Sequence, residues 1–187
     1  MVLSSESIKR HLIEGKLVIE GFKESSFRPA SYLLRLSDHI LLMEQHDREI
    51  DTKSTDTKSF FKAIQIPIEG YVLKPGDFIL GASVESLSLP NSLCGELSQL
   101  SCYARVGLSI NFSANYVAPT FGHNNPSSIT FEIKNESCND IRIYSRVNFC
   151  HIRFMQTDLD VKSSYNGIYS GHKEAKAADF STKPAKG

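Results

Sequence analysis

Glu132 is the carboxylate of this sequence whose neighbours fit acid–base chemistry best. Residues 129–134 read I-T-F-E-I-K, an alternation of apolar and polar side chains. Successive side chains of a β-strand point to opposite faces, so Thr130, Glu132 and Lys134 share the face opposite the apolar residues. One interpretation is a solvated strand face with Glu132 near Lys134, which the pattern alone favours. The other is a pocket in which burial raises the pKa of Glu132, so that it works as a general acid and base.

A second group of reactive side chains lies in residues 98–108, which read S-Q-L-S-C-Y-A-R-V-G-L. This segment combines Ser101, Cys102 and Arg105 with a glycine, and it falls between two expected strands. It is either an ordinary connection, in which Arg105 pairs with a surface carboxylate, or a polar contribution to a binding site. The spacing of these residues is compatible with both.

The sequence lacks the usual signatures of metal and cofactor enzymes. The four cysteines, Cys94, Cys102, Cys138 and Cys150, form no C-x-x-C pair, and the six histidines have no ligand spacing, so we expect no zinc site. The zinc-deaminase pattern, H-x-E followed by P-C-x-x-C, is absent. The Walker, G-x-G-x-x-G, G-x-S-x-G and H-E-x-x-H motifs are absent as well.

Composition and charge narrow the class of protein further. The 187 residues are 41% hydrophobic and 22% charged, which suits one domain with a sizeable core. Lys and Arg number 21, as do Asp and Glu, and this zero net charge argues against binding to a nucleic-acid polymer or a membrane surface. No apolar run approaches the roughly 20 residues of a membrane span, and residues 1–15 do not read as a signal peptide. We therefore expect a soluble, cytoplasmic protein.

Secondary-structure signals predict one short helix followed by many short strands. Ser4 can cap a helix whose apolar residues are Ile8, Leu12 and Ile13, and Gly15 can end it. We expect strands over residues 17–19, 31–36, 40–44, 59–68, 71–73, 78–89, 95–97, 107–112, 129–134, 141–144 and 147–155. Short strands at near-regular spacing predict an all-β fold, either a sandwich, a jelly roll or a barrel.

Two stretches read as loops or tails. Residues 44–59 are charged and rich in Ser and Thr, which predicts a solvated excursion. We expect one β domain over residues 1–157 and a tail over residues 158–187, which is polar. Composition alone favours a frayed tail, because a polar segment has little to bury. The rings and glycines of residues 165–171 (Y-N-G-I-Y-S-G) also suit a lid over a flat ligand.

Taken in order, these segments resemble the motifs of one family over nearly the whole chain. The similar segments are residues 29–36 (P-A-S-x-D-L-R-L), 73–90 (H-P-G-E and L-E-x-x-x-L-P), 101–108 (S-S-L-A-R-L-G-L), 113–115 (T-A-G), 130–132 (T-L-E) and 165–171 (Y-x-x-K-Y-x-G). No single fragment is specific, but the ordered set resembles the dCTP deaminase branch of the trimeric dUTPase-like family.

The resemblance implies a fold, an assembly and a reaction. The fold would be a distorted β jelly roll, or β-clip, with a short N-terminal helix, assembled as a homotrimer with three sites at subunit interfaces. Each site would bind a deoxycytidine nucleotide with Mg²⁺ on its phosphates and no zinc, and the flexible tail would close over it. Glu132 would take a proton from a water that attacks C4 of cytosine and pass protons to the leaving ammonia. Ser101 and the carbonyl of Ala114 would hold that water, and Arg105 would orient the pocket.

Further positions match the part of the family's site that holds the nucleotide. These positions are Cys102, Asn115, Tyr116, Val117, Tyr165, Tyr169, His172 and Lys173. Several departures fall among such contacts. Leu100 and Ile168 stand where the family has cations, Ala118 stands where it has an aspartate, and residues 122–128 are about four residues longer. We therefore expect weak discrimination among phosphorylation states, with Lys173, and less certainly Arg153, as substitutes for the missing cations.

The resulting hypothesis is deamination of a cytosine deoxynucleotide of the dCTP type to the uracil nucleotide, with release of ammonia. The alternative is a non-catalytic or regulatory trimer of the same fold that binds a nucleotide. A dUTP diphosphohydrolase is a weaker alternative, because Ala118 stands where the aspartate that activates its water would be.

Overall fold

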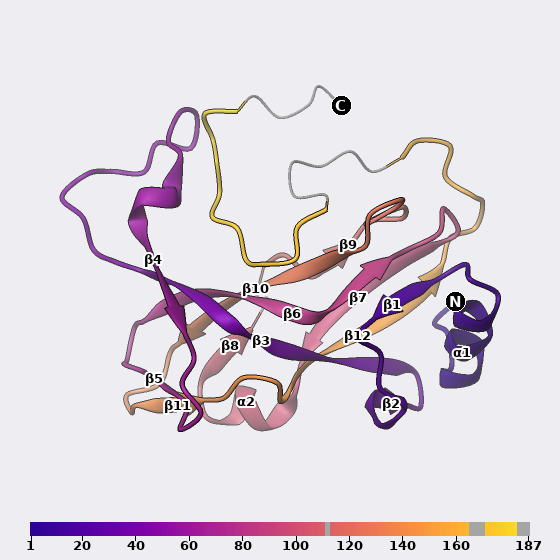
Figure 1. Ribbon diagram of the computed structural model, residues 1–187, viewed down its shortest axis with the longest axis horizontal. Helices are drawn as coiled ribbons and strands as arrows, with labels where there is room; N and C mark the ends of the chain where they lie inside the picture. Colours follow the sequence, from indigo (N-terminus) through magenta and orange to yellow (C-terminus); the bar gives the residue numbers. More distant parts are fainter. Residues whose placement is uncertain (111–112, 165–170, 183–187) are drawn as a thin grey trace.

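The computed structural model describes residues 1–110, 113–164 and 171–182 (Figure 1). The chain forms a curled ten-stranded sheet and a separate two-stranded sheet of β5 and β11, with few helices, which confirms the predicted all-β class. The helical elements are α1 (Ser5–Ile13), η1 (Glu24–Ser26), η2 (Thr57–Phe60) and α2 (Ser101–Arg105). The strands are β1 (Val18–Glu20), β2 (Phe27–Arg28), β3 (Ser31–Met43), β4 (Phe61–Gln65), β5 (Tyr71–Leu73), β6 (Phe78–Ser88), β7 (Leu93–Gln99), β8 (Leu108–Ile110), β9 (Tyr116–Val117), β10 (Ser127–Asn135), β11 (Ile141–Ile143) and β12 (Asn148–Gln156).

Strand β3 joins the two halves of the sheet, whose order is β8-β10-β6-β3-β12-β7-β9. Its first residues, up to Arg35, pair with β12, whereas Leu36 and the residues after it pair with β6 and then β4. The register between β3 and β6 shifts between Leu36 and Ile40. A shift of this kind bends a strand and increases its twist, so β3 passes from one layer to the other without a break in the chain.

A buried ion pair lies at this bend in β3. Nε of Arg35 binds Oε1 of Glu85 on β6 at 2.6 Å, and the backbone N–H of Arg35 donates to Oε2 at 2.9 Å. Nη2 of Arg35 also donates to the carbonyl of Gly21 at 2.7 Å. The two side chains are 8% and 0% exposed. The pair therefore fixes three segments of chain at the place where the layers meet.

The core fills the space between the layers, with Tyr32, Phe131, Phe149 and Phe154 among its fully buried side chains. Helix α1 covers one end of it through Ile8, and the start of the helix confirms the sequence prediction. Oγ of Ser4 accepts a hydrogen bond from the N–H of Ser7 at 3.3 Å. Among the described residues, no helix combines the length and the apolarity that a membrane crossing requires.

The structure corrects four details of the sequence prediction. The two runs expected at 31–36 and 40–44 are one strand, because the polar residues between them lie at the register shift rather than in a turn. Residues 101–105 form the short helix α2, whose single turn leaves too little periodicity to detect. The start of the run expected at 59–68 is the turn η2. The two-residue strand β9 went unpredicted, because only two positions pair with β7.

The chain after β12 returns across the sheet and is held there by several hydrogen bonds, so its described part is not frayed. The N–H of Gly171 donates to Oγ of Ser127 at 2.7 Å, at the start of β10. Further along, the carbonyl of Ala178 accepts from both the N–H and the hydroxyl of Thr57, at 2.9 and 2.6 Å. Residues 171–182 therefore form a strap between β10 and the 44–60 excursion, which is the predicted 44–59 segment together with Phe60, and they run beside it in Figure 1. Thr57 and Phe60 are buried, so this excursion is only partly solvated.

Candidate active site

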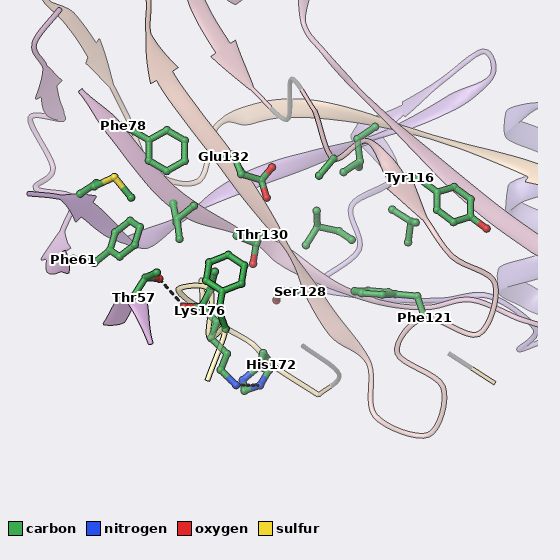
Figure 2. Close-up of a pocket in the computed structure, with 18 of the residues that line it drawn as sticks. Thr57, Phe61, Phe78, Tyr116, Phe121, Ser128, Thr130, Glu132, His172 and Lys176 are labelled. Carbon is green, nitrogen blue, oxygen red and sulfur yellow. Dashed lines mark hydrogen bonds between the residues drawn. The ribbon is translucent and has the colours of Figure 1, made fainter. Parts of the chain in front are cut away.

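A cavity of about 510 Å³ lies between the sheet and the strap (Figure 2). Its floor comes from neighbouring strands β10, β6, β3 and β4, and its cover comes from the strap and the 44–60 excursion. The volume falls in the range of ordinary ligand pockets. Most of the lining is apolar, and Glu132 is its one carboxylate among the described residues.

Glu132 occupies the middle of this cavity. It lies on β10 directly opposite Leu80 of β6, and it shares its face with Thr130, which also lines the cavity. The residues on either side of it, Phe131 and Ile133, are fully buried in the core, as the alternation predicted. Burial raises the pKa of the Glu132 carboxyl above its usual value, since a charged carboxylate loses hydration there. A raised pKa makes a carboxyl group better suited to act as both a general acid and a general base.

Two compartments flank Glu132. The first, the hairpin compartment, is lined by Ala114, Tyr116, Val117, Ala118 and Phe121, from β9 and the loops around it. Figure 2 shows Tyr116 and Phe121 on this side of Glu132. Three of the positions predicted from the resemblance therefore line the cavity with Glu132. The predicted Asn115 does not line the cavity, although its two neighbours do, and its carbonyl accepts a hydrogen bond from the N–H of Leu97.

The hairpin loop contains an unusual backbone conformation. Thr120 has a φ of 64°, although its side chain is β-branched and 6% exposed. This left-handed region is expensive for such residues, and glycine is the usual occupant. The loop thus keeps the shape of a glycine turn without the glycine.

The second compartment, here called the phenylalanine compartment, is lined by Met43, Phe61, Phe78 and Leu80 from the sheet, with Ile50 from the excursion. Leu80 faces Glu132 across β6 and β10, and Met43 pairs with Phe61 across β3 and β4. Phe61 and Phe78 lie on the opposite side of Glu132 from Tyr116 and Phe121 (Figure 2). None of these residues was predicted to belong to the site.

The strap supplies the cavity's cover and its lysine. His172, Lys176, Ala178 and Phe180 line the cavity, and Nζ of Lys176 lies 3.3 Å from Nε2 of His172. The prediction for His172 agrees with this placement. Lys173 lies outside the lining, and its ammonium binds Glu20 at 2.5 Å.

The other predicted cation is also engaged elsewhere. Arg153 binds Glu96 at 3.0 Å. Lys176, three residues beyond the predicted Lys173, is the lysine that lines the described cavity, and only the docked strap shows this. The predicted Tyr165 and Tyr169 lie outside the described residues.

Ser101, Cys102 and Arg105 do not line the cavity with Glu132. They lie on α2, which Figure 1 shows on the far side of the sheet from the strap. Tyr103 anchors this helix, with its ring 5.1 Å from that of Phe149 and its hydroxyl donating to the carbonyl of Asn148 at 3.1 Å. Every residue of the helix remains at least partly exposed. One copy of the chain therefore presents the two predicted groups of site residues on separate surfaces.

The described residues contain no group of three or more His, Cys, Asp or Glu side chains that could hold a metal ion. The four cysteines are unbridged, and Cys94, Cys102 and Cys138 retain some exposure. The cavity therefore offers a proton-transfer group, aromatic and aliphatic walls and one lysine. This set suits a flat, largely apolar ring that undergoes proton transfer.

Comparisons with known proteins agree with these features. The chain is 31% identical over 170 residues to "dCTP deaminase, dUMP-forming" of Dictyoglomus thermophilum, a match that covers 88% of this chain and 85% of that protein. It is 28% identical over 179 residues to the protein of the same name from Persephonella marina, covering 95% and 96% of the two chains.

The fold is also similar to a solved structure, the 2′-deoxycytidine 5′-triphosphate deaminase from Agrobacterium tumefaciens. The TM-score is 0.63 at 18% identity, and the match covers 82% of this chain and 47% of that chain. This likeness concerns the fold alone, since the chain spans about half the length of that protein. A family model described as dCTP deaminase-like matches residues 2–157, nearly the whole β region. The chain therefore belongs to the dCTP deaminase-like family.

Proposed function

We propose that this protein deaminates a cytosine deoxynucleotide of the dCTP type to the uracil nucleotide and releases ammonia. The observation that carries the proposal is Glu132, a carboxyl group with a raised pKa in the middle of an apolar cavity. The family supports it, because two relatives that cover most of the chain are named dCTP deaminases.

The reaction needs one group that moves protons twice. The Glu132 carboxylate would take a proton from water while the water oxygen forms a bond to C4 of cytosine. The C4–N4 bond then breaks, N4 leaves as ammonia with one proton from the water, and N3 keeps the other. A carboxyl group whose pKa lies close to the working pH serves both transfers, and general acid–base catalysis of this kind contributes about 10²–10⁴-fold in rate.

We propose that a second copy of the chain completes the site. Ser101 and Arg105 lie on the partly exposed helix α2 and outside the cavity that holds Glu132. In a homotrimer, the α2 of one copy would face the cavity of its neighbour, where Ser101 and the carbonyl of Ala114 would hold the water. Mixing makes this testable: Glu132→Gln and Arg105→Ala chains, each inactive alone, should regain part of the activity when co-assembled. Unrestored activity in a confirmed mixed trimer would contradict the shared site.

We propose that Mg²⁺ arrives with the phosphates of the nucleotide and that the reaction uses no zinc. The described side chains offer the cation no cluster of ligands, whereas phosphate oxygens bind it well. Lys176 is the one lysine of the described lining that could contact the phosphates. Because a single lysine distinguishes poorly between phosphate chains of different length, we expect weak discrimination among dCTP, dCDP and dCMP. Stoichiometric zinc in the purified protein, with loss of activity on its removal, would overturn this part.

The deciding experiment measures ammonia and pyrophosphate from dCTP and from dUTP with wild type and Glu132→Gln. We expect ammonia from dCTP and at least a hundredfold loss in the variant. The relatives' name "dUMP-forming" implies a second hydrolysis, for which pyrophosphate is the readout. Glu132 is the one carboxylate of the described lining, so we expect ammonia without stoichiometric pyrophosphate. The absence of both ammonia and pyrophosphate would indicate a non-catalytic nucleotide-binding protein.

A further inference from the structure

The phenylalanine compartment has no role in the reaction proposed above. That reaction places C4 of the base at Glu132, with the sugar and phosphates on the side of the hairpin compartment. The space beyond Glu132, bounded by Met43, Phe61, Phe78 and Leu80, remains part of the same cavity. An apolar space beside a bound ring favours a group that can fill it.

The lining determines what kind of group this is. Its floor is aromatic and aliphatic throughout the described residues, and the hydroxyl of Thr57 at its edge already donates to the carbonyl of Ala178 at 2.6 Å. A hydroxyl or amide placed here would lose its hydrogen bonds to water and gain no side-chain replacement. The compartment therefore selects for a hydrocarbon group.

The geometry of the base fixes which atom can carry that group. The N3 and O2 edge of cytosine needs hydrogen-bond partners, whereas C5 and C6 form its apolar edge. C5 is bonded to C4, so it lies next to Glu132 whenever C4 does. With the polar edge turned toward the backbone of β9, the C5 edge faces Leu80 and Phe78.

We propose that the phenylalanine compartment is a subsite for an apolar substituent at C5 of the cytosine ring, so that the protein binds 5-methylcytosine deoxynucleotides in preference to unsubstituted ones. This inference rests on the proposed function for the orientation of the base. Turnover of such a substrate follows the same balance of atoms: water supplies the oxygen at C4, N4 leaves as ammonia, and the product is the thymine nucleotide.

Binding to Glu132→Gln tests the subsite without turnover. Calorimetry would give Kd values for dCTP and 5-methyl-dCTP on the full chain. Burial of one methyl group corresponds to about a fourfold gain in affinity, so 5-methyl-dCTP should bind at least about fourfold more tightly than dCTP.

Two variants and one control locate the effect. Leu80→Phe fills the compartment and should abolish the preference for the methyl group, whereas Leu159→Phe makes the same change at a side chain that is 76% exposed and should keep it. If Leu80→Phe does not fold, Phe61→Ala decides, because the enlarged compartment should shift the preference toward 5-propynyl-dCTP.

The outcomes separate this inference from the proposed function. Equal Kd values for dCTP and 5-methyl-dCTP, undetectable binding of both, or a methyl preference that Leu80→Phe leaves intact would overturn the subsite. A methyl preference in binding with no ammonia from the wild type would instead support the subsite and contradict deamination. Ammonia from dCTP together with equal Kd values for dCTP and 5-methyl-dCTP would support deamination and contradict the subsite.

Discussion

The ion pair at the bend in β3 gives the sharpest stability prediction. Glu85→Gln keeps the shape of the side chain. In the wild type, both carboxylate oxygens accept hydrogen bonds from Arg35, whereas in the variant one of these positions is an NH₂ group, which cannot accept. The variant also leaves a guanidinium that is 8% exposed without its counter-charge. Breaking one partner of a buried pair costs about 3–5 kcal/mol. For a chain of this size, that corresponds to a fall in Tm of roughly 6–20 °C.

The assay is thermal unfolding followed by circular dichroism at a fixed protein concentration, because assembly makes Tm depend on concentration. Asp140→Asn is the matched control, since it removes the same charge from the exposed pair with Lys74, whose side chains are 65% and 50% exposed. An exposed pair of this kind contributes at most about 1 kcal/mol. The double variant Arg35→Met, Glu85→Leu should recover much of the loss. Similar Tm changes in Glu85→Gln and Asp140→Asn would refute the reasoning.

Three further predictions concern the site. Burial raises the pKa of Glu132 above its ordinary 4.5, so the stability contributed by its protonated form is present below pH 4.5 and is lost as pH rises through the folded pKa. Urea unfolding should therefore show the wild type losing stability relative to Glu132→Gln as the pH rises above 4.5, and a pH-independent difference would contradict this. Thr120→Gly should relieve the φ of 64° and raise the free energy of unfolding by about 1 kcal/mol in chemical denaturation, whereas Thr120→Ala should not; equal effects of the two would exclude backbone strain as the cause. Thr57→Val removes one hydrogen bond to Ala178 and should speed trypsin cleavage within the strap about two- to tenfold, with Thr57→Ser as the control. Unchanged cleavage would mean that the remaining contacts hold the strap without the Thr57 hydroxyl.

Local patterns predicted the parts of the fold that depend on neighbouring residues. The alternation at residues 129–134 identified the strand and the face of Glu132, since a period of two survives whatever the strand pairs with. The cap at Ser4 identified the first helix for the same reason, because the capping bond spans three residues.

Features that depend on distant contacts could not be predicted in this way. The continuity of β3 depends on a register shift against β6. In the sequence alone, the polar residues between Leu36 and Ile40 suggest a turn at this place instead. The place of Lys176 depends on hydrogen bonds between Ala178 and Thr57, 121 residues apart. The phenylalanine compartment combines side chains from three strands, and its residues are ordinary core types in sequence.

The contact between the strap and the 122–126 loop restricts how this chain can be recombined with its relatives. Gly171 has a φ of 79°, and a Cβ there would lie 2.4 Å from Nδ2 of Asn125. A grafted tail with any other residue at this position would meet both the side chain of that loop and an unfavourable backbone conformation. A grafted tail must therefore carry glycine at the position of Gly171. Chimeras whose tail keeps this glycine should keep the docked strap, whereas a tail with another residue there should dock more weakly, because a side chain is strained at a φ of 79°.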